Sequence, residues 1–262
     1  MLRPILLRLC WLLAAFPLAG ANAAEPPTIR LASLAWLPYV GPNLPQGGLS
    51  GAVAEAAAKD FGHRVRVDYF PWMRAMQVGG KDPEFSGYFP AYYTEERARQ
   101  CHFSAPMGVS TVGLAYLRSK PVHWQSLPDL AGKLIGVVAG YSNGEAFDAL
   151  VKDGRQKVDV SPSDVVNLQK LLAQRVDGVA IDKSVLRYLL ATDLRLIAAR
   201  DQIAFHDKPL AELTLHICFQ RTLAGWKLQQ NYDKGLRRID IRKIENDYFK
   251  LLEARARPGP AN

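Results

Sequence analysis

The stretch that decides the fold runs from residue 28 to residue 76, TIRLASLAWLPYVGPNLPQGGLSGAVAEAAAKDFGHRVRVDYFPWMRAM. Residues 28–35 (TIRLASLA) have the pattern of a strand, and residues 49–61 (LSGAVAEAAAKDF) that of an Ala-rich helix followed by a glycine. Residues 64–70 (RVRVDYF) alternate as a second strand, and Pro71 fits the first turn of a second helix. Strands and helices in alternation predict an α/β fold, in which helices cover a parallel sheet.

The same alternation returns further along the chain. Residues 133–139 (KLIGVVA) predict a buried strand that is followed by a helix at 145–152. Residues 178–181 (GVAI) predict another short strand, which is followed by a helix at 183–190. A strand at 213–219 (LTLHICF) and two helices then close the chain. The chain therefore contains α/β units in series.

The loops that follow strands are the first places to look for a binding site. In an open α/β sheet, ligands bind beyond the carboxyl ends of the strands, where loops and helix N-termini converge. Four loops follow predicted strands, and they begin at Trp36, Phe89, Gly140 and Asp182. We expect the site residues in these loops.

The first 23 residues have the order of a secretory signal peptide. Arg3 and Arg8 form a basic head, an apolar run follows, and small residues end at Ala23. The alternative is a lipoprotein with Cys10 as the lipidated residue, but the apolar run mostly follows this cysteine. We expect Cys10 to be removed with the signal peptide and the remaining chain to work in the periplasm.

Composition excludes several classes of function. The apolar fraction of 48% is typical of a globular core, and no later run is long enough to cross a membrane. Without the first 23 residues the chain has 31 basic and 25 acidic residues, an excess that suits an anionic small molecule but also fits scattered surface charges. No basic stripe interleaved with aromatics indicates nucleic acid, and no Cys/His cluster has metal-ligand spacing. We predict no metal, no cofactor and no nucleic-acid partner.

Two cysteines, Cys101 and Cys218, stay in the exported chain. An even number of cysteines in an oxidising compartment favours a disulfide, and two buried free thiols are the alternative. The residues alone leave both open.

The most specific motif is GYFPAYYTEERARQCHFSAP, residues 87–106, in which Thr, two polar residues and Arg precede a Phe-Ser-x-Pro run. Supporting pieces are the Trp-x-Pro-Tyr loop at 36–39 and the run LPDLAGKLIGV at 127–137. Together these segments resemble the family 3 extracellular solute-binding proteins, the periplasmic receptors of amino-acid ABC transporters. The resemblance covers residues 28–252, nearly all of the exported chain.

The resemblance implies a type II periplasmic binding fold, in which two α/β lobes joined by two crossover strands close on a ligand like a hinge. Lobe 1 is expected to comprise residues 24–109 and 213–262, and lobe 2 residues 110–212. The crossovers are expected near 109–112 and 210–214. Both cysteines then fall in lobe 1, which slightly favours the disulfide.

The resemblance also implies two charged ligand contacts, one from each lobe. Arg97 is expected to bind a ligand carboxylate, which a planar guanidinium suits better than Lys does. Asp182 is expected to bind a ligand ammonium, so that the two residues bracket a zwitterion in the closed form. The alternatives are an Arg97 that pairs with Glu95 or Glu96, and an Asp182 that only caps the next helix.

Further site candidates also have simpler interpretations. Ser142 is expected to donate to a ligand carboxylate, with a helix cap as the alternative. Trp36 and Trp72 are expected to line the cleft, with burial in the core as the alternative. Tyr92 and Tyr39 are weaker aromatic candidates.

One departure from the family pattern concerns the ligand. Amino-acid receptors of this family carry small hydroxyl residues on the strand that leads to the arginine motif, whereas this chain has FPAY at 89–92. Pro90 has no N–H to donate, so one typical backbone contact to the ligand is missing and a ligand other than a standard α-amino acid becomes an alternative. Arg74 is either a second cation in the cleft or a solvated helix residue.

Three functions remain open at this stage. The preferred one is a monomeric, non-catalytic receptor that passes an amino acid or similar small carboxylate to an inner-membrane ABC permease. The second is a dehydratase of the cyclohexadienyl type, which needs a general acid, and Glu145 and Asp182 are its only candidates. The third is a sensory accessory protein. We predict no catalytic residue and no enzyme activity.

Overall fold

Within residues 25–256, the part of the chain that the computed structural model describes, ten strands form one sheet. The strands are β1 (Thr28–Ser33), β2 (Arg64–Tyr69), β3 (Gly87–Tyr92), β4 (Cys101–Phe103), β5 (Gly108–Leu117), β6 (Ile135–Val138), β7 (Val158–Ser161), β8 (Gly178–Asp182), β9 (Ile203–Phe205) and β10 (Ala211–Gln220). Their order is β2-β1-β3-β10-β5-β8-β6-β7, with β4 paired to β10 and β9 paired to β5. The predicted signal peptide, residues 1–23, lies outside the described residues.

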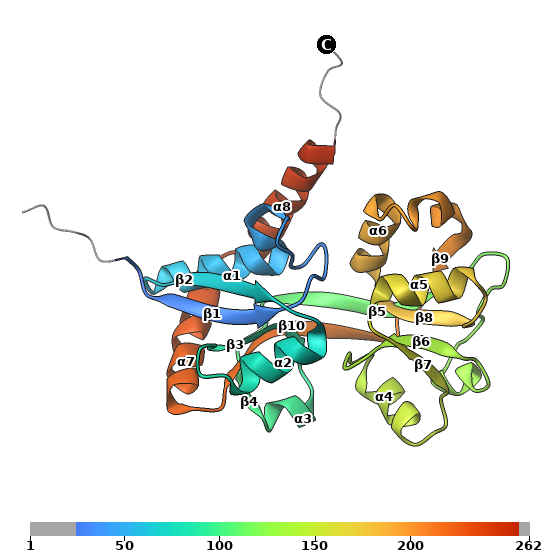
Figure 1. Ribbon diagram of the computed structural model, residues 1–262, viewed down its shortest axis with the longest axis horizontal. Helices are drawn as coiled ribbons and strands as arrows, with labels where there is room; N and C mark the ends of the chain where they lie inside the picture. The colour runs from blue at the N-terminus through green and yellow to red at the C-terminus, as the bar shows by residue number, and fades with distance from the viewer. Residues whose placement is uncertain (1–24, 257–262) are drawn as a thin grey trace, which may run out of the picture.

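Helices accompany the sheet in both halves of the molecule (Figure 1). They are η1 (Pro45–Gly47), α1 (Leu49–Asp60), α2 (Trp72–Lys81), α3 (Glu95–Ala98), η2 (Leu127–Leu130), α4 (Glu145–Lys152), α5 (Asp164–Leu172), α6 (Lys183–Thr192), η3 (Ile197–Gln202), α7 (Leu223–Arg238) and α8 (Ile241–Ala256). Helix α2 packs on β1, β3 and β10, and α1 packs on α7 and α8, whereas α5 and α6 pack on β8 and β5. None of the helices in the described part combines the length and the apolar character that a bilayer crossing requires.

Each half contains the parallel strand pairs that the alternating pattern predicts. Strand β1 runs parallel to β2 and β3, and β6 runs parallel to β7 and β8. Strands β6 and β8 are buried at every position, because helices cover parallel strands of this kind on both faces. The α/β class is confirmed.

Two long strands, β5 and β10, run between the two halves (Figure 1). They pair with each other antiparallel over residues 108–112 and 211–215. Beyond that shared segment β5 pairs with β8 and β9, whereas β10 pairs with β3 and β4. The residue pattern gives little sign of the start of β5, residues 108–111, because Gly108 has no side chain, Ser110 and Thr111 are polar, and Val109 is the only apolar residue there.

The prediction that a loop begins at Phe89 is wrong, because β3 continues to Tyr92. The β3–β10 ladder shifts register here, so that Phe89 and Pro90 together oppose the single residue Ile217. A proline without an N–H fits at such a bulge, where a ladder bond is already missing. The strand therefore delivers its last residues to the site instead of ending before them.

Cys101 on β4 and Cys218 on β10 form a disulfide, with their Cα atoms 5.5 Å apart. The two strands are neighbours in the sheet, and the pairing of Gln220 with Cys101 brings the cysteines together. Of the two alternatives left open by the sequence, the structure contains the disulfide. It closes a chain segment of 117 residues.

The hydrophobic core has two parts. The larger cluster extends from β1 and α1 through the shared strands to α5 and α6, and the smaller one lies beside α4 around Phe147. Successive residues of a strand point to opposite faces, so Val179 and Ile181 of β8 join the larger cluster and Ala180 joins the smaller. The shared strands are thus packed over much of their length.

Candidate functional site

A cleft lies where β1, β3 and β6 end, as expected for an open α/β sheet. It contains about 280 Å³ of space, open solvent at its mouth included. We call it the interlobe cleft, and its lining residues are Leu34, Trp36, Trp72, Pro90, Tyr92, Arg97 and Tyr141. Six of them belong to the half that contains β1, and Tyr141 comes from the other half, on the loop after β6.

Arg97 connects the two sides of the interlobe cleft. Helix α3 begins after Thr94, whose hydroxyl accepts from the Arg97 backbone N–H at 3.2 Å and so fixes the helix start. The guanidinium donates from Nη1 to the Tyr92 carbonyl at 3.0 Å and from Nη2 to the Gly140 carbonyl at 2.8 Å. Burial lowers the pKa of Arg97, but an arginine stays protonated in a protein. The cleft therefore contains a permanent positive charge.

The guanidinium is free to bind an anion. No salt bridge joins Arg97 to Glu95, Glu96 or another carboxylate among the residues that the structure describes. A guanidinium has five N–H groups, and the two bonds to carbonyls use two of them. The remaining groups suit the two oxygens of a carboxylate.

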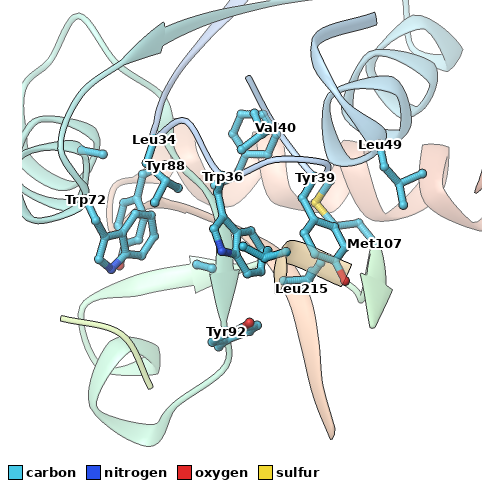
Figure 2. Close-up of a cluster of buried hydrophobic side chains, with 14 of the residues drawn as sticks. Leu34, Trp36, Tyr39, Val40, Leu49, Trp72, Tyr88, Tyr92, Met107 and Leu215 are labelled. Carbon is cyan, nitrogen blue, oxygen red and sulfur yellow. The ribbon is translucent and has the colours of Figure 1, made fainter. Parts of the chain in front are cut away.

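Aromatic rings form most of the cleft walls. Trp36 stacks on Tyr39 with ring centroids 4.5 Å apart, and its edge meets Tyr92 at 5.9 Å and Tyr141 at 6.4 Å. Trp72 meets Tyr141 edge-on at 6.3 Å. Figure 2 shows Trp36 between Trp72 and Tyr39. Both tryptophans are over 90% buried and also line the cleft, so each belongs to the core and to the cleft wall.

The Gly140 carbonyl is the shared acceptor of the cleft. Besides Arg97, the Trp72 indole donates to it from Nε1 at 3.1 Å. Gly140 has φ +75°, and a Cβ at this position would lie 2.4 Å from the Met73 sulfur. A glycine is favoured here, because other residues rarely adopt this φ and a Cβ would have to displace the Met73 side chain.

Asp182 lies behind the cleft and does not line it. Its Oδ1 accepts from the Val185 backbone N–H at 2.8 Å, which caps α6, and its Oδ2 accepts from Ser110 at 2.6 Å and Tyr39 at 3.1 Å. The Tyr92 and Ser110 hydroxyls are 2.7 Å apart, which completes what we call the buried network of Tyr39, Tyr92, Ser110 and Asp182. Burial raises the pKa of Asp182, and these hydrogen bonds oppose that rise. The structure does not bring Asp182 to the same cleft surface as Arg97.

Ser142 is already engaged. Its hydroxyl donates to Asp148 Oδ2 at 2.6 Å, and the Asn143 backbone N–H donates to the same carboxylate. The cap of α4 is Gly144, so Ser142 does not cap this helix. Burial raises the pKa of Asp148, while the hydrogen bond from Ser142 and the charge of Arg97 lower it.

Two other candidates lie away from the cleft. Arg74 is exposed on α2 and donates to Gln77 at 3.1 Å. Glu145, the first residue of α4, is also exposed and does not line the cleft.

Sequence reasoning missed Tyr141 and Asp164. Tyr141 directly follows Gly140, in a loop where site residues were expected, and an aromatic residue just past a buried strand was the available signal. Asp164 is the first residue of α5, and burial raises its pKa to about 7, with the charge of Asp182 adding to the rise. In the sequence, Asp164 is an acidic residue directly after the helix cap Ser163, and nothing in this pattern indicates that the aspartate is buried.

No family model and no curated protein matches the chain. Many solved structures match it, and three of them cover most of its length. The substrate-binding protein AbpA of an amino acid ABC transporter from Streptococcus pneumoniae, bound to L-arginine, is 17% identical, with a TM-score of 0.67, 85% of this chain covered and 94% of that chain.

Two further similar structures are named for other functions. The ancestral amino acid-binding protein AncCDT-1, a precursor of cyclohexadienyl dehydratase, is 18% identical, with a TM-score of 0.65, 87% of this chain covered and 94% of that chain. A histidine kinase sensor domain with similarity to periplasmic binding proteins is 18% identical, with a TM-score of 0.69, 88% of this chain covered and 96% of that chain. These likenesses confirm the two-lobed periplasmic binding protein fold, and at such identities they establish the fold alone.

Proposed function

We propose that this chain is a periplasmic solute-binding protein that captures an amino acid or similar small carboxylate for an ABC-type uptake system. The observation that carries the proposal is the half-buried Arg97 guanidinium, which has no carboxylate partner among the described residues and lies in an aromatic cleft with residues from both lobes. Similar structures include amino-acid-binding proteins, one of them from an ABC transporter, which supports the class of ligand.

In this proposal the lobes close like a hinge about β5 and β10. Lobe 1 comprises residues 24–109 and 213–262, and lobe 2 comprises residues 110–212. Lobe 1 contributes Arg97 and the two tryptophans, and lobe 2 contributes Tyr141. A ligand carboxylate on the guanidinium is then enclosed when Tyr141 moves against the tryptophan rings.

The proposed location follows from the export signal read in residues 1–23. The disulfide between Cys101 and Cys218 supports it, because disulfides persist in the oxidising periplasm and are rare in the cytosol. We propose that the chain acts there as a monomer and meets the permease with its cleft closed.

We propose binding without catalysis. A dehydratase needs an acid within hydrogen-bond reach of the leaving hydroxyl, and no Asp or Glu lines the cleft, while Asp182 is held in the buried network. Incubation with prephenate or arogenate should give no aromatic product above a protein-free blank, and such a product would overturn this part of the proposal. A sensory role would use the same ligand site with a different partner.

The test of the proposal is ligand-dependent thermal stabilisation. Amino acids and small organic acids are screened one at a time against the exported chain. A ligand present at a hundredfold excess over its dissociation constant stabilises the native state by about 2.7 kcal/mol. For a chain of this size we expect the unfolding temperature to rise by roughly 5–10 °C.

Matched arginine variants locate the binding site. Arg97→Ala should abolish the shift given by any acid that stabilises the wild type, because the cation that meets its carboxylate is gone. Arg74→Ala removes an equal charge from the exposed face of α2 and should keep the full shift. An undiminished shift in Arg97→Ala, or equal losses in both variants, would contradict the proposed carboxylate clamp.

A further inference from the structure

The residues that line the interlobe cleft offer a charged partner to a carboxylate but no charged partner to an ammonium. Among its lining residues, Arg97 is the only charged one, and the others are aromatic or apolar. An ammonium in such a cleft can bind an aromatic face, but the Arg97 guanidinium already lies over the Trp72 ring at 5.7 Å. A second positive charge nearby would be repelled by the first.

The hydrogen-bond acceptors next to Arg97 are also occupied. The Tyr92 carbonyl accepts from Arg97 Nη1, and the Gly140 carbonyl accepts from Arg97 Nη2 and from Trp72 Nε1. An ammonium carries three N–H donors, each of which needs an acceptor once it leaves water. Both lone pairs of the Gly140 carbonyl are in use, and an ammonium at the second lone pair of the Tyr92 carbonyl would lie beside the Arg97 guanidinium, whose positive charge repels it.

The acid that the resemblance assigned to an ammonium is committed elsewhere. Asp182 accepts from the Val185 N–H, from Ser110 and from Tyr39, and it does not line the cleft. Tyr92, whose hydroxyl meets Ser110 at 2.7 Å, presents its ring to the cleft in front of this network. The Tyr92 ring therefore separates the polar groups of the buried network from the cleft, and a ligand meets an aromatic surface there.

The walls suit a ring. Trp36, Trp72, Tyr92 and Tyr141 supply faces and edges that pack well on another aromatic ring. The apolar side chains around them exclude water, which strengthens a hydrogen-bonded pair between Arg97 and a carboxylate. Resting on the proposed function, we infer that the ligand is an aromatic monocarboxylate without an α-ammonium group, held by Arg97 at one end and by the aromatic walls at the other.

The test compares two compounds that differ only in the ammonium. 3-Phenylpropanoate and L-phenylalanine are titrated into the exported chain by isothermal titration calorimetry. We expect 3-phenylpropanoate to bind at least tenfold more tightly. L-phenylalanine binding as tightly or more tightly overturns the inference, and so does a failure of 3-phenylpropanoate to bind.

Two further compounds separate this inference from the proposal on which it rests. 3-Cyclohexylpropanoate keeps the carboxylate and saturates the ring, and we expect it to bind severalfold more weakly; equal affinity overturns the aromatic part of the inference. 3-Phenylpropanamide keeps the ring and removes the charge, and we expect its binding to be lost. Equal binding of amide and acid, unchanged in Arg97→Ala, would overturn the carboxylate clamp itself and with it the proposed function.

Discussion

Removal of the disulfide tests the architecture of the half that contains β1. The double variant Cys101→Ala/Cys218→Ala releases a loop closed over 117 residues. In the chain-entropy treatment, a cross-link of this span lowers the entropy of the unfolded chain and stabilises the native state by about 5 kcal/mol. Domains are stable by roughly 5–15 kcal/mol in all, so we expect a loss of a third or more.

The native state should survive the loss. Strands β4 and β10 remain paired through their backbones, and Cys218 lies in the larger core cluster, where alanine leaves only a small gap. We therefore expect an unchanged circular dichroism spectrum for the variant and an earlier midpoint of unfolding in urea. The slope of the urea transition should increase, because an unfolded chain without the cross-link exposes more surface.

The assay is urea unfolding followed by tryptophan fluorescence, with chemically reduced wild type as the control. Reduced wild type should unfold within about 1 kcal/mol of the double variant, since both lack the same constraint. A loss below about 1 kcal/mol in either sample, with the slope unchanged, would refute the entropic reasoning. It would mean that the unfolded chain already holds these two strands close together.

The remaining predictions concern pH and packing. The pKa of Asp164 is raised from 3.8 to about 7 in the folded chain, so the native state holds a proton that the unfolded state loses, and stability should fall as pH rises from about 4 to 7. Asp164→Asn should remove the part of that fall that Asp164 causes, which is on the order of 4 kcal/mol at most. Urea unfolding at several pH values measures this, and a decline in stability identical to that of the wild type would contradict the prediction. Gly79→Ala should destabilise by about 1–3 kcal/mol, because its Cβ would lie 2.6 Å from the Gly87 carbonyl. Its neighbour Gly80→Ala meets nothing closer than 3.9 Å and should be neutral or stabilising by up to about 1 kcal/mol; equal effects of the two changes would show that backbone approach does not set the cost.

The period of the hydrophobic residues and the turn residues were enough to predict the α/β class and several strands, among them β1, β2, β6, β8 and β10. They failed where the pattern was locally weak. The start of β5, residues 108–111, has Val109 as its only apolar side chain, and β3 contains a proline, which is tolerated because β3 itself bulges where it pairs with β10. Both facts depend on the partner strand, which lies more than 90 residues away in the chain.

The candidate site was also predictable only in part, because some of its contacts join segments that are distant in the chain. Arg97 and the two tryptophans stand in recognisable motifs at strand ends, and the structure brings them to one cleft. The partners of Asp182 come from distant segments, Tyr39 at a separation of 143 residues and Ser110 at 72, so its commitment to the buried network left no local signal. The choice between Tyr141 and Ser142 as the cleft residue depends on the backbone turn at Gly140, which residue types alone do not specify.

The Gly140 carbonyl, which accepts from both Arg97 and Trp72, limits how a substitution can change the contact between the lobes. A backbone carbonyl is present whatever residue occupies the position, so only loss of the donors Arg97 and Trp72 can delete these hydrogen bonds. A Cβ at position 140, in contrast, would meet the side chains of Met73, Met76 and Trp72 on α2, and these would have to shift to make room for it. Because Gly140 also has a φ of +75°, which other residues rarely adopt, an alanine there would strain the backbone turn that presents the shared carbonyl to both donors, without removing any group that would hold a ligand.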